Sequence, residues 1–313
     1  MVDHTKKTGK RNLKTLRPRK HKQLEFFIAD EVDVSTFRDE IASMEHPFFA
    51  LKGGDTKIRQ YKNGSVIVTV RPAVEIGLAT IFDKDIWIYA ISKLQEAINN
   101  GRPISRIITF TPYDFFVTTN RSSSGVGYRE LKKALSRLKG TTIETNIVYS
   151  EDKEETAIFG LIDKARILED KKGQLEIGMV ELTLPEWLYQ AITRTKVLQI
   201  SPDYFRIRKA IDRRLYEIAR KHCGSQHEFI ISLDKLYSKT GSTAALSKFK
   251  FNIKQLAKIN DLPDYEILFD PTTDKVTFKN RNQNTPKAEA ARKREKGKKE
   301  IFNIKNRILK KKE

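Results

Sequence analysis

The chain has 313 residues, of which 39% are hydrophobic, so it is long enough for two domains that each bury a core. A single cysteine, Cys223, excludes an internal disulfide framework, and no apolar run approaches the length of a membrane span or a signal-peptide core. The formal net charge of +20 predicts a polyanionic partner, and we expect a cytoplasmic protein with no membrane partner.

Positive charge is concentrated at the two ends of the chain. Residues 1–22 contain nine Lys and Arg and one acidic residue, and residues 286–313 contain twelve and four. We predict a basic disordered tail at 1–22 and a basic tail at 284–313, both suited to phosphate contacts. Charge alone leaves DNA, RNA and an acidic membrane surface open.

Residues 23–57 are predicted to form a loosely structured arm. The elements that follow are a strand at 65–70, a helix at 83–101, a strand at 105–110, a helix opened by Thr111 and Pro112, a basic helix at 127–139, a hairpin over 141–168, a strand at 173–184 and a helix at 185–192. A second series contains a helix at 201–224, a strand at 228–231, a helix at 232–241, a basic helix at 243–259 and a hairpin over 265–278.

The order helix, strand, helix, basic helix, hairpin therefore occurs twice. Apolar residues have the same spacing in the two basic helices: Tyr128, Leu131, Leu135 and Leu138 in the first, and Leu246, Phe249, Ile253 and Leu256 in the second. This order predicts an α+β fold of two tandem winged-helix domains, residues 58–195 and 196–283. A winged helix is a helix-turn-helix followed by a β-hairpin.

A helix-turn-helix places its second helix in the major groove of DNA, so the face opposite the apolar stripe is the candidate reader. In the second basic helix and its hairpin, the candidate residues are Ser247, Lys248, Lys250, Phe251, Lys254, Gln255, Lys258, Lys275, Lys279 and Arg281. In the first basic helix they are Arg129, Lys133, Ser136 and Arg137, beside Glu130. The alternative is a solvated surface helix or, for the first unit, a packing or dimer surface.

The segment QLEFF offers Gln23, Leu24, Phe26 and Phe27 as a partner-binding motif, unless it packs on the first domain of its own chain. His222, Cys223 and His227 lie close in sequence, but a structural role is favoured over a metal site. No phosphate-binding GxxxxGK[ST] loop and no catalytic constellation is recognisable. We therefore expect no enzyme activity, no metal and no cofactor.

Five segments together resemble the replication initiator protein A family of plasmid initiators, within the two-winged-helix class. They are QLEFFIAD, MEHPFFAL, ITFTPYDFFVTTNR, YRELKKALSRLKGTTIETNI and RIRKAIDRRLYEIARKHCG, and the resemblance covers residues 23–283. It implies that monomers bind repeated origin sites (iterons) in double-stranded DNA. It also implies recruitment of the host initiator and replicative helicase, and repression of the protein's own gene by a dimer joined through the first domain.

QLEFF is also similar to the sliding-clamp-binding pentapeptide, in which Phe26 stands where Leu is usual. The alternatives are a tandem winged-helix transcriptional repressor without a role in replication, and a relaxase that nicks DNA.

Overall fold

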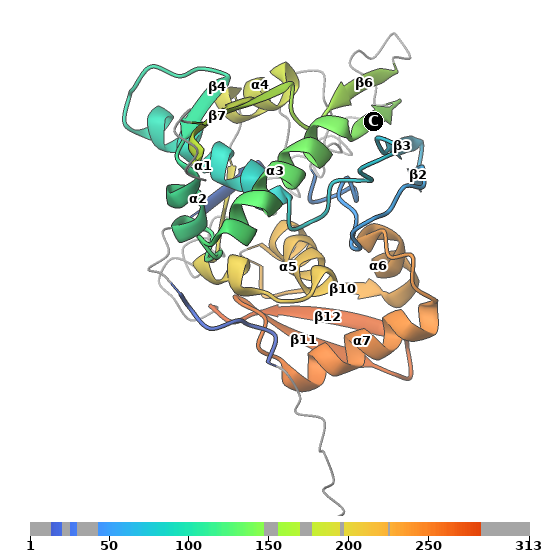
Figure 1. The fold of residues 1–313 in the computed structure, drawn as a ribbon. Helices are drawn as coiled ribbons and strands as arrows, with labels where there is room; N and C mark the ends of the chain where they lie inside the picture. Colours follow the sequence, from blue (N-terminus) through green and yellow to red (C-terminus); the bar gives the residue numbers. More distant parts are fainter. Residues whose placement is uncertain are drawn as a thin grey trace, which may run out of the picture.

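The computed structural model describes residues 14–20, 26–29, 43–146, 156–169, 177–194, 197–224 and 226–282. The rest of the two predicted tails and the acidic turn at 150–155 lie outside these ranges. Within them the chain has a mixed α+β fold of helices and antiparallel sheets (Figure 1). None of the described helices has the length and apolar content needed to span a bilayer.

The N-terminal half, residues 43–194, contains most of the predicted elements with small shifts of their ends. They are β2 (Arg59–Asn63), β3 (Val66–Arg71), α1 (Lys84–Asn99), β4 (Ile107–Phe110), α2 (Pro112–Thr118), α3 (Gly125–Gly140), β5 (Thr142–Thr145), β6 (Ala157–Gly160), β7 (Lys164–Glu169), β8 (Ile177–Thr183) and α4 (Glu186–Arg194). Strand β2 was not predicted. Helix α2 begins as expected, because the Thr111 side chain accepts a hydrogen bond from the Asp114 amide and Pro112 occupies the first turn.

The C-terminal half, residues 197–282, follows the second predicted series. Its elements are β9 (Val197–Ile200), the 3₁₀ helix η1 (Pro202–Arg206), α5 (Ala210–His222), β10 (Glu228–Ser232), α6 (Leu233–Thr240), α7 (Leu246–Ile259), β11 (Tyr265–Asp270) and β12 (Lys275–Asn280). The predicted helix at 201–224 is divided into η1 and α5, because the backbone is extended at Ile207 and Lys209. Strand β9 was not predicted.

All strand pairs in the described sheets are antiparallel. The strand orders are β2-β3-β5-β6 and β4-β8-β7 in the N-terminal half, β10-β12-β11 in the C-terminal half, and β1-β9, where β1 is Phe26–Ala29. The hairpin of β5 with β6 and that of β11 with β12 confirm the two predicted hairpins.

The predicted strand at 156–168 is divided between two sheets. β6 pairs with β5, whereas β7 pairs with β8. Between them Leu161 and Ile162 are fully buried, and the Leu161 carbonyl accepts a hydrogen bond of 2.8 Å from the Trp87 indole. The chain therefore turns into the core at this point, which alternation in the sequence does not reveal.

Buried apolar side chains from both halves form one continuous cluster, rather than the two separate cores expected from the chain length. In α3, Leu131, Leu135 and Leu138 are buried, as the shared spacing predicts. In α7, Phe249, Ile253 and Leu256 are buried, but Leu246 is 42% exposed because the first turn of the helix lies beyond the core.

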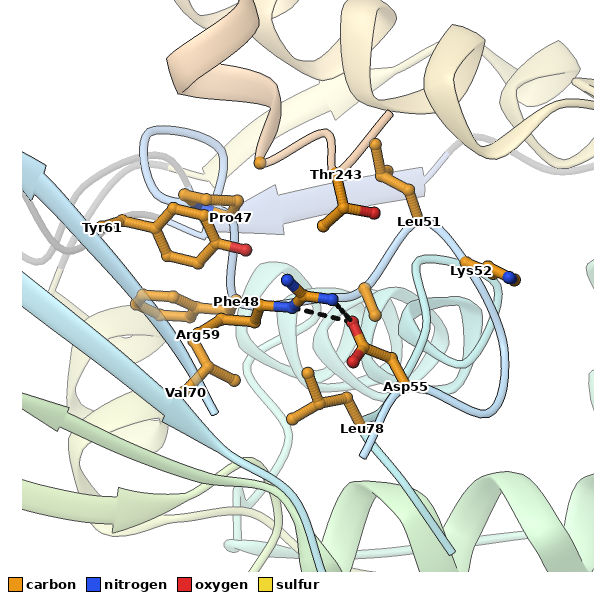
Figure 2. Close-up of a pocket in the computed structure, with 12 residues that line it drawn as sticks. Pro47, Phe48, Leu51, Lys52, Asp55, Arg59, Tyr61, Val70, Leu78 and Thr243 are labelled. Atoms are coloured by element: carbon orange, nitrogen blue, oxygen red, sulfur yellow. Dashed lines mark hydrogen bonds and ion pairs between the residues drawn. The ribbon is translucent and has the colours of Figure 1, made fainter. Parts of the chain in front are cut away.

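The two halves meet closely at the turn between α6 and α7. Gly241 there has φ +66°, and a Cβ atom would lie 2.5 Å from the Pro47 Cβ, so the turn requires glycine. Figure 2 shows the narrow pocket at this contact, which is lined by residues of the N-terminal half and by Gly241 and Thr243 of the C-terminal half. Two of its charged groups are paired with each other: Arg59 donates to Asp55 at 2.9 and 2.7 Å (Figure 2). The pocket is therefore a packing contact between the halves.

Two predicted segments are more ordered than expected. In the predicted loosely structured arm at 23–57, Met44 and Phe48 are fully buried and belong to the core, because apolar side chains so close to the folded part pack against it. In the predicted disordered tail, residues 14–20 cross the surface in a fixed path, with Thr15 buried and its amide bound to Asp261. Both predictions were wrong for these residues.

Buried ion pairs join α1 of the N-terminal half to α5 of the C-terminal half. Lys84 lies 2.9 Å from Glu217, and Arg213 is bound to Asp85, with all four side chains no more than 2% exposed. Burial alone would raise the pKa of Glu217, but Lys84 and Arg214 outweigh it and hold this pKa below its ordinary value. The lowered pKa favours the ionised Glu217 carboxylate, whereas burial lowers the pKa of Lys84, so each member of this pair depends on the other for compensation.

We predict that Arg213→Met lowers the free energy of unfolding by about 3–5 kcal/mol, because the buried Asp85 carboxylate loses a partner. Arg213 also donates to the carbonyls of Phe205 (3.0 Å) and Ile207 (3.1 Å), which adds to the loss. Urea unfolding followed by circular dichroism measures the change. The matched control is Arg71→Met, whose pair with Glu144 is exposed, and there a loss below about 1 kcal/mol is expected. Equal losses in the two variants would contradict the role of the buried pair.

We predict a pH-dependent effect at Asp212, in the first turn of α5. Burial raises the pKa of Asp212 from 3.8 to about 6, and its Oδ2 atom has no hydrogen-bond partner. Because the pKa of Asp212 is higher in the folded than in the unfolded state, the folded state binds the carboxyl proton more tightly. The stability of the fold therefore falls as pH rises from about 4 through 6, where the buried carboxyl group must ionise. Asp212→Asn should match the wild type at pH 4 and exceed it by as much as about 3 kcal/mol at pH 7. Urea unfolding at both pH values tests this; a difference independent of pH would refute it.

Candidate nucleic-acid interface

Helix α7 presents a basic face to solvent. Phe249, Ile253 and Leu256 point into the core, and the residues on the opposite side are exposed or half-buried. The exposed ones are Ser247, Lys248, Phe251, Lys254 and Lys258, and the half-buried ones are Lys250 and Gln255. No acidic residue occurs in α7. The structure therefore brings these seven predicted residues together on and beside one outward face.

The packing of α6 fixes the direction of this face. The Tyr237 ring meets the Phe249 ring edge-on, with centroids 5.2 Å apart. The Tyr237 hydroxyl donates a hydrogen bond of 2.8 Å to the Ala244 carbonyl, which anchors the connection just before α7. Because these contacts fix the start of α7 and its inward stripe, they also determine which residues point outward.

Aromatic rings hold three of the lysines near this face. The Lys248 ammonium lies 4.8 Å from the centroid of the Phe251 ring, and Phe251 itself is 50% exposed. The ammonium groups of Lys250 and Lys254 each lie 5.7 Å from the Phe269 ring in β11. Cation–π contact attracts the ammonium groups without neutralising them, so they remain available to phosphate or base acceptors. The alternation of β11 could have suggested Phe269, but sequence analysis missed it.

Lys250 differs from the other lysines of α7. Its ammonium lies 2.6 Å from a carboxylate oxygen of Asp274, a residue with φ +48° in the turn between β11 and β12. The charge of Lys250 is therefore partly compensated by the hairpin, whereas no ion pair involves Lys248 or Lys254 within the described residues.

The predicted hairpin residues do not join the α7 face. Phe269, which contacts the α7 lysines, is paired in the strand register with the buried Val276, so both side chains lie on the face of the sheet toward α7. Side chains alternate along β12, and Lys275 and Lys279 therefore lie on the opposite face. Lys279 also stands between Glu228 and Glu266 in the strand register. These positions reflect tertiary packing that the sequence does not specify.

Arg281 has a structural role at the end of α7. Its guanidinium donates to the carbonyl oxygen of Asn260 and, at 3.1 Å, to the Oδ1 atom of the same residue. Asn260 is the left-handed C-cap of α7, with φ +51°. Arg281 therefore satisfies acceptors at the C-terminus of the helix, where positive charge is favourable.

Helix α3 offers a weaker face. Arg129, Lys133 and Ser136 are exposed, but Lys133 lies 3.2 Å from Glu130 and the Ser136 hydroxyl donates to the backbone. Arg137, predicted to point outward, instead binds Asp83 with two hydrogen bonds of 2.8 Å. These bonds raise the pKa of the Arg137 guanidinium, which is committed to the start of α1. Arg137 is thus a contact within the N-terminal half.

The QLEFF segment lies at the edge of the described residues. Gln23 and Leu24 are outside them. The backbone of Phe26 and Phe27 belongs to β1, where the two residues pair with Ile200 and Gln199 of β9. The backbone pairing is the arrangement expected if the segment packs on its own chain.

The His and Cys residues near the end of α5 have protein partners. His222 Nε2 lies 2.8 Å from Glu45, and the Cys223 thiol is buried and donates weakly to the Gln226 and Phe278 carbonyls. Burial raises the pKa of Cys223 to about 11. Among the described residues, no group of three or more His, Cys, Asp and Glu side chains has the geometry of a metal site.

We predict that Arg281→Ala lowers the free energy of unfolding by about 1 kcal/mol, because the C-terminal acceptors of α7 lose their donor. Affinity for duplex DNA should fall less than twofold if Arg281 acts only as this cap. Thermal unfolding and a binding titration on the same preparation measure the two effects. A large loss of affinity with unchanged stability would instead assign Arg281 to the DNA contact.

Comparison with known proteins agrees with the resemblance found in the sequence. The profile of the family described as Replication initiator protein A matches residues 38–267. A protein of Wigglesworthia glossinidia brevipalpis, provisionally named a replication protein, is 60% identical over 265 residues, which cover 84% of this chain and 96% of that protein.

Two crystal structures of domains 2 and 3 of RctB share the fold. Their TM-scores are 0.52 and 0.50, at 10% and 12% sequence identity, and the match covers 74% of this chain and 93% and 94% of theirs. This likeness concerns the fold alone. Because the family profile spans most of the chain and a relative at 60% identity matches 84% of it, the protein belongs to the replication initiator protein A family.

Proposed function

We propose that the protein initiates plasmid DNA replication by binding repeated sites (iterons) in double-stranded origin DNA. The observation that carries the proposal is the outward face of α7, which has no acidic residue and exposes Lys248, Lys254 and Phe251. The groups on this face suit base edges as well as phosphates: lysine donates to guanine, Gln255 would pair with adenine, and a phenyl ring contacts a thymine methyl.

Each half acts as a winged helix in this proposal. In the C-terminal half, α6 and α7 form the helix-turn-helix and the hairpin of β11 and β12 forms the wing. In the N-terminal half, α2 and α3 have the same order before the hairpin of β5 and β6. Both α3 and α7 lie on the near side of the molecule in Figure 1, which supports contact of both helices with one duplex. α7 is the main reader, because Arg137 and Glu130 weaken the α3 face.

The protein acts by assembly on DNA and has no catalytic step of its own in this proposal. Binding at several iterons strains the duplex and provides a platform for the host initiator and replicative helicase. A dimer joined through the N-terminal half represses the protein's own gene. These parts rest on membership of the family and not on a measured contact.

The test is selection of bound duplexes from a randomised pool by the purified chain at about 0.15 M salt, where nonspecific binding is weakened. An asymmetric site longer than one helical turn is expected, since two reading helices contact successive grooves. A short palindromic site would favour the transcriptional repressor. Nicking of supercoiled origin DNA in the presence of a divalent metal would favour the relaxase.

We predict that Lys254→Ala weakens binding to the selected site by about 1–3 kcal/mol and relaxes preference at one position, if the ammonium donates to a base. The matched control is Lys164→Ala, which removes an exposed lysine from β7, outside both helix-turn-helix units, and should leave affinity nearly unchanged. Binding titrations on the selected site and on single-base variants measure the effect. An unchanged base preference with a smaller salt dependence would assign Lys254 to a phosphate instead.

A further inference from the structure

Residues 14–20 form a strap that joins the two halves of the molecule. At one end the Thr15 amide donates 3.0 Å to Asp261, which follows α7. At the other end the Lys20 amide donates 2.5 Å to the Asn120 side chain, in the turn between α2 and α3. Figure 1 shows the strap in dark blue, below the end of α2.

Backbone hydrogen bonds fix the strap between these ends. The Arg17 amide donates to the Arg206 carbonyl at 2.7 Å, and the Arg208 amide donates to the Thr15 carbonyl at 3.0 Å. The Asn120 side chain donates to the Pro18 carbonyl at 3.2 Å. Thr15 is buried, whereas four basic side chains of the strap are exposed: Lys14, Arg17, Arg19 and Lys20. The strap therefore presents positive charge from a fixed backbone.

Positive charge exceeds negative charge at the centre of the strap. Arg121 and Arg213 share the carboxylate of Asp85, but no ion pair involves Arg17 or Arg208 within the described part of the chain. Burial and the nearby guanidinium groups of Arg213, Arg208 and Arg121 lower the pKa of Arg17. The Arg208 guanidinium donates to the Leu16 carbonyl of the strap at 3.4 Å. Arg17 thus lies near three other arginines and one carboxylate that already binds two of them, an arrangement that favours an added anion.

A second group of arginines extends this patch along the strap. Arg19 and Arg206 lie 2.7 and 2.8 Å from the same oxygen of Asp203. One carboxylate again serves two guanidinium groups, so the excess positive charge continues beyond Arg17. An extended row of partly compensated guanidinium groups fits a polymer of phosphates better than one isolated anion.

We propose that Arg17 and Arg208 bind backbone phosphates of the DNA segment that joins the two half-sites. The proposal rests on the proposed function, because only a duplex that contacts both α3 and α7 would run along the strap. The strap is anchored beside the N-terminal end of α3 and the C-terminal end of α7, so it lies at the seam between the two reading helices. Such contacts position the duplex without reading its sequence.

The test compares the strap variant, Arg17→Ala/Arg208→Ala, with a matched control, Lys164→Ala/Arg166→Ala. The control removes two exposed basic residues from β7, in the β4-β8-β7 sheet of the N-terminal half. The strap variant should bind both the selected site and a random duplex about tenfold more weakly. The slope of log binding constant against log salt concentration should be smaller in magnitude by about 1.8, the value for two lost phosphate contacts. The β7 variant should keep the affinity and slope of the wild type.

A charge-retaining variant, Arg17→Lys/Arg208→Lys, separates charge from folding. It should recover most of the affinity, and urea midpoints of all variants should match that of the wild type. Phosphate ethylation should interfere with wild-type binding between the half-sites, and this interference should disappear in the alanine variant.

Unchanged affinity and slope in the alanine variant would overturn the proposal, as would a loss confined to the selected sequence. If the wild type selects no sequence, the proposed function fails. The salt dependence of binding to a random duplex, compared between the wild type and the alanine variant, then still decides whether the strap binds phosphates.

Discussion

The buried ion pairs between α1 and α5 determine how the two halves are placed. Lys84 with Glu217 and Arg213 with Asp85 are removed from water, and desolvation of a single unpaired member would cost several kcal/mol. A displacement of one half relative to the other would separate these charges inside the core. The relative placement of the halves is therefore tied to the stability of the whole chain, and the continuous apolar cluster around the pairs reinforces it.

This constraint has a consequence for DNA binding. In the proposed complex both α3 and α7 contact one duplex, so their separation must match the spacing of successive grooves. Because the halves are held together before DNA arrives, less conformational entropy is lost on binding. The strap at 14–20 spans the same seam and is hydrogen-bonded to both halves. One seam thus combines the buried charges that fix the geometry and the exposed arginines suited to phosphates.

Much of the local structure could be predicted from the sequence. Apolar spacing predicted the inward stripes of both basic helices, and with them the outward position of Phe251, Lys248 and Lys254. Short-range rules also predicted the cap at Thr111 and the two hairpins. Such features depend on residues close together in the chain. Short-range rules did not reveal that Arg137 binds Asp83 and that Arg281 binds Asn260, because these partners are 54 and 21 residues away in sequence.

The sequence by itself determined the order of the main helices and hairpins, the family and the basic character of α7, since each follows from residue type and local spacing. The tertiary structure alone decided which charges are free. Lys250 and Arg137 are each bound to a carboxylate, whereas no ion pair involves Lys254 or Arg17 within the described ranges. It also decided that residues 14–20 are ordered, although their composition is that of a disordered tail. The physical reason is that pairing and burial depend on distances in space, which contacts between distant segments set.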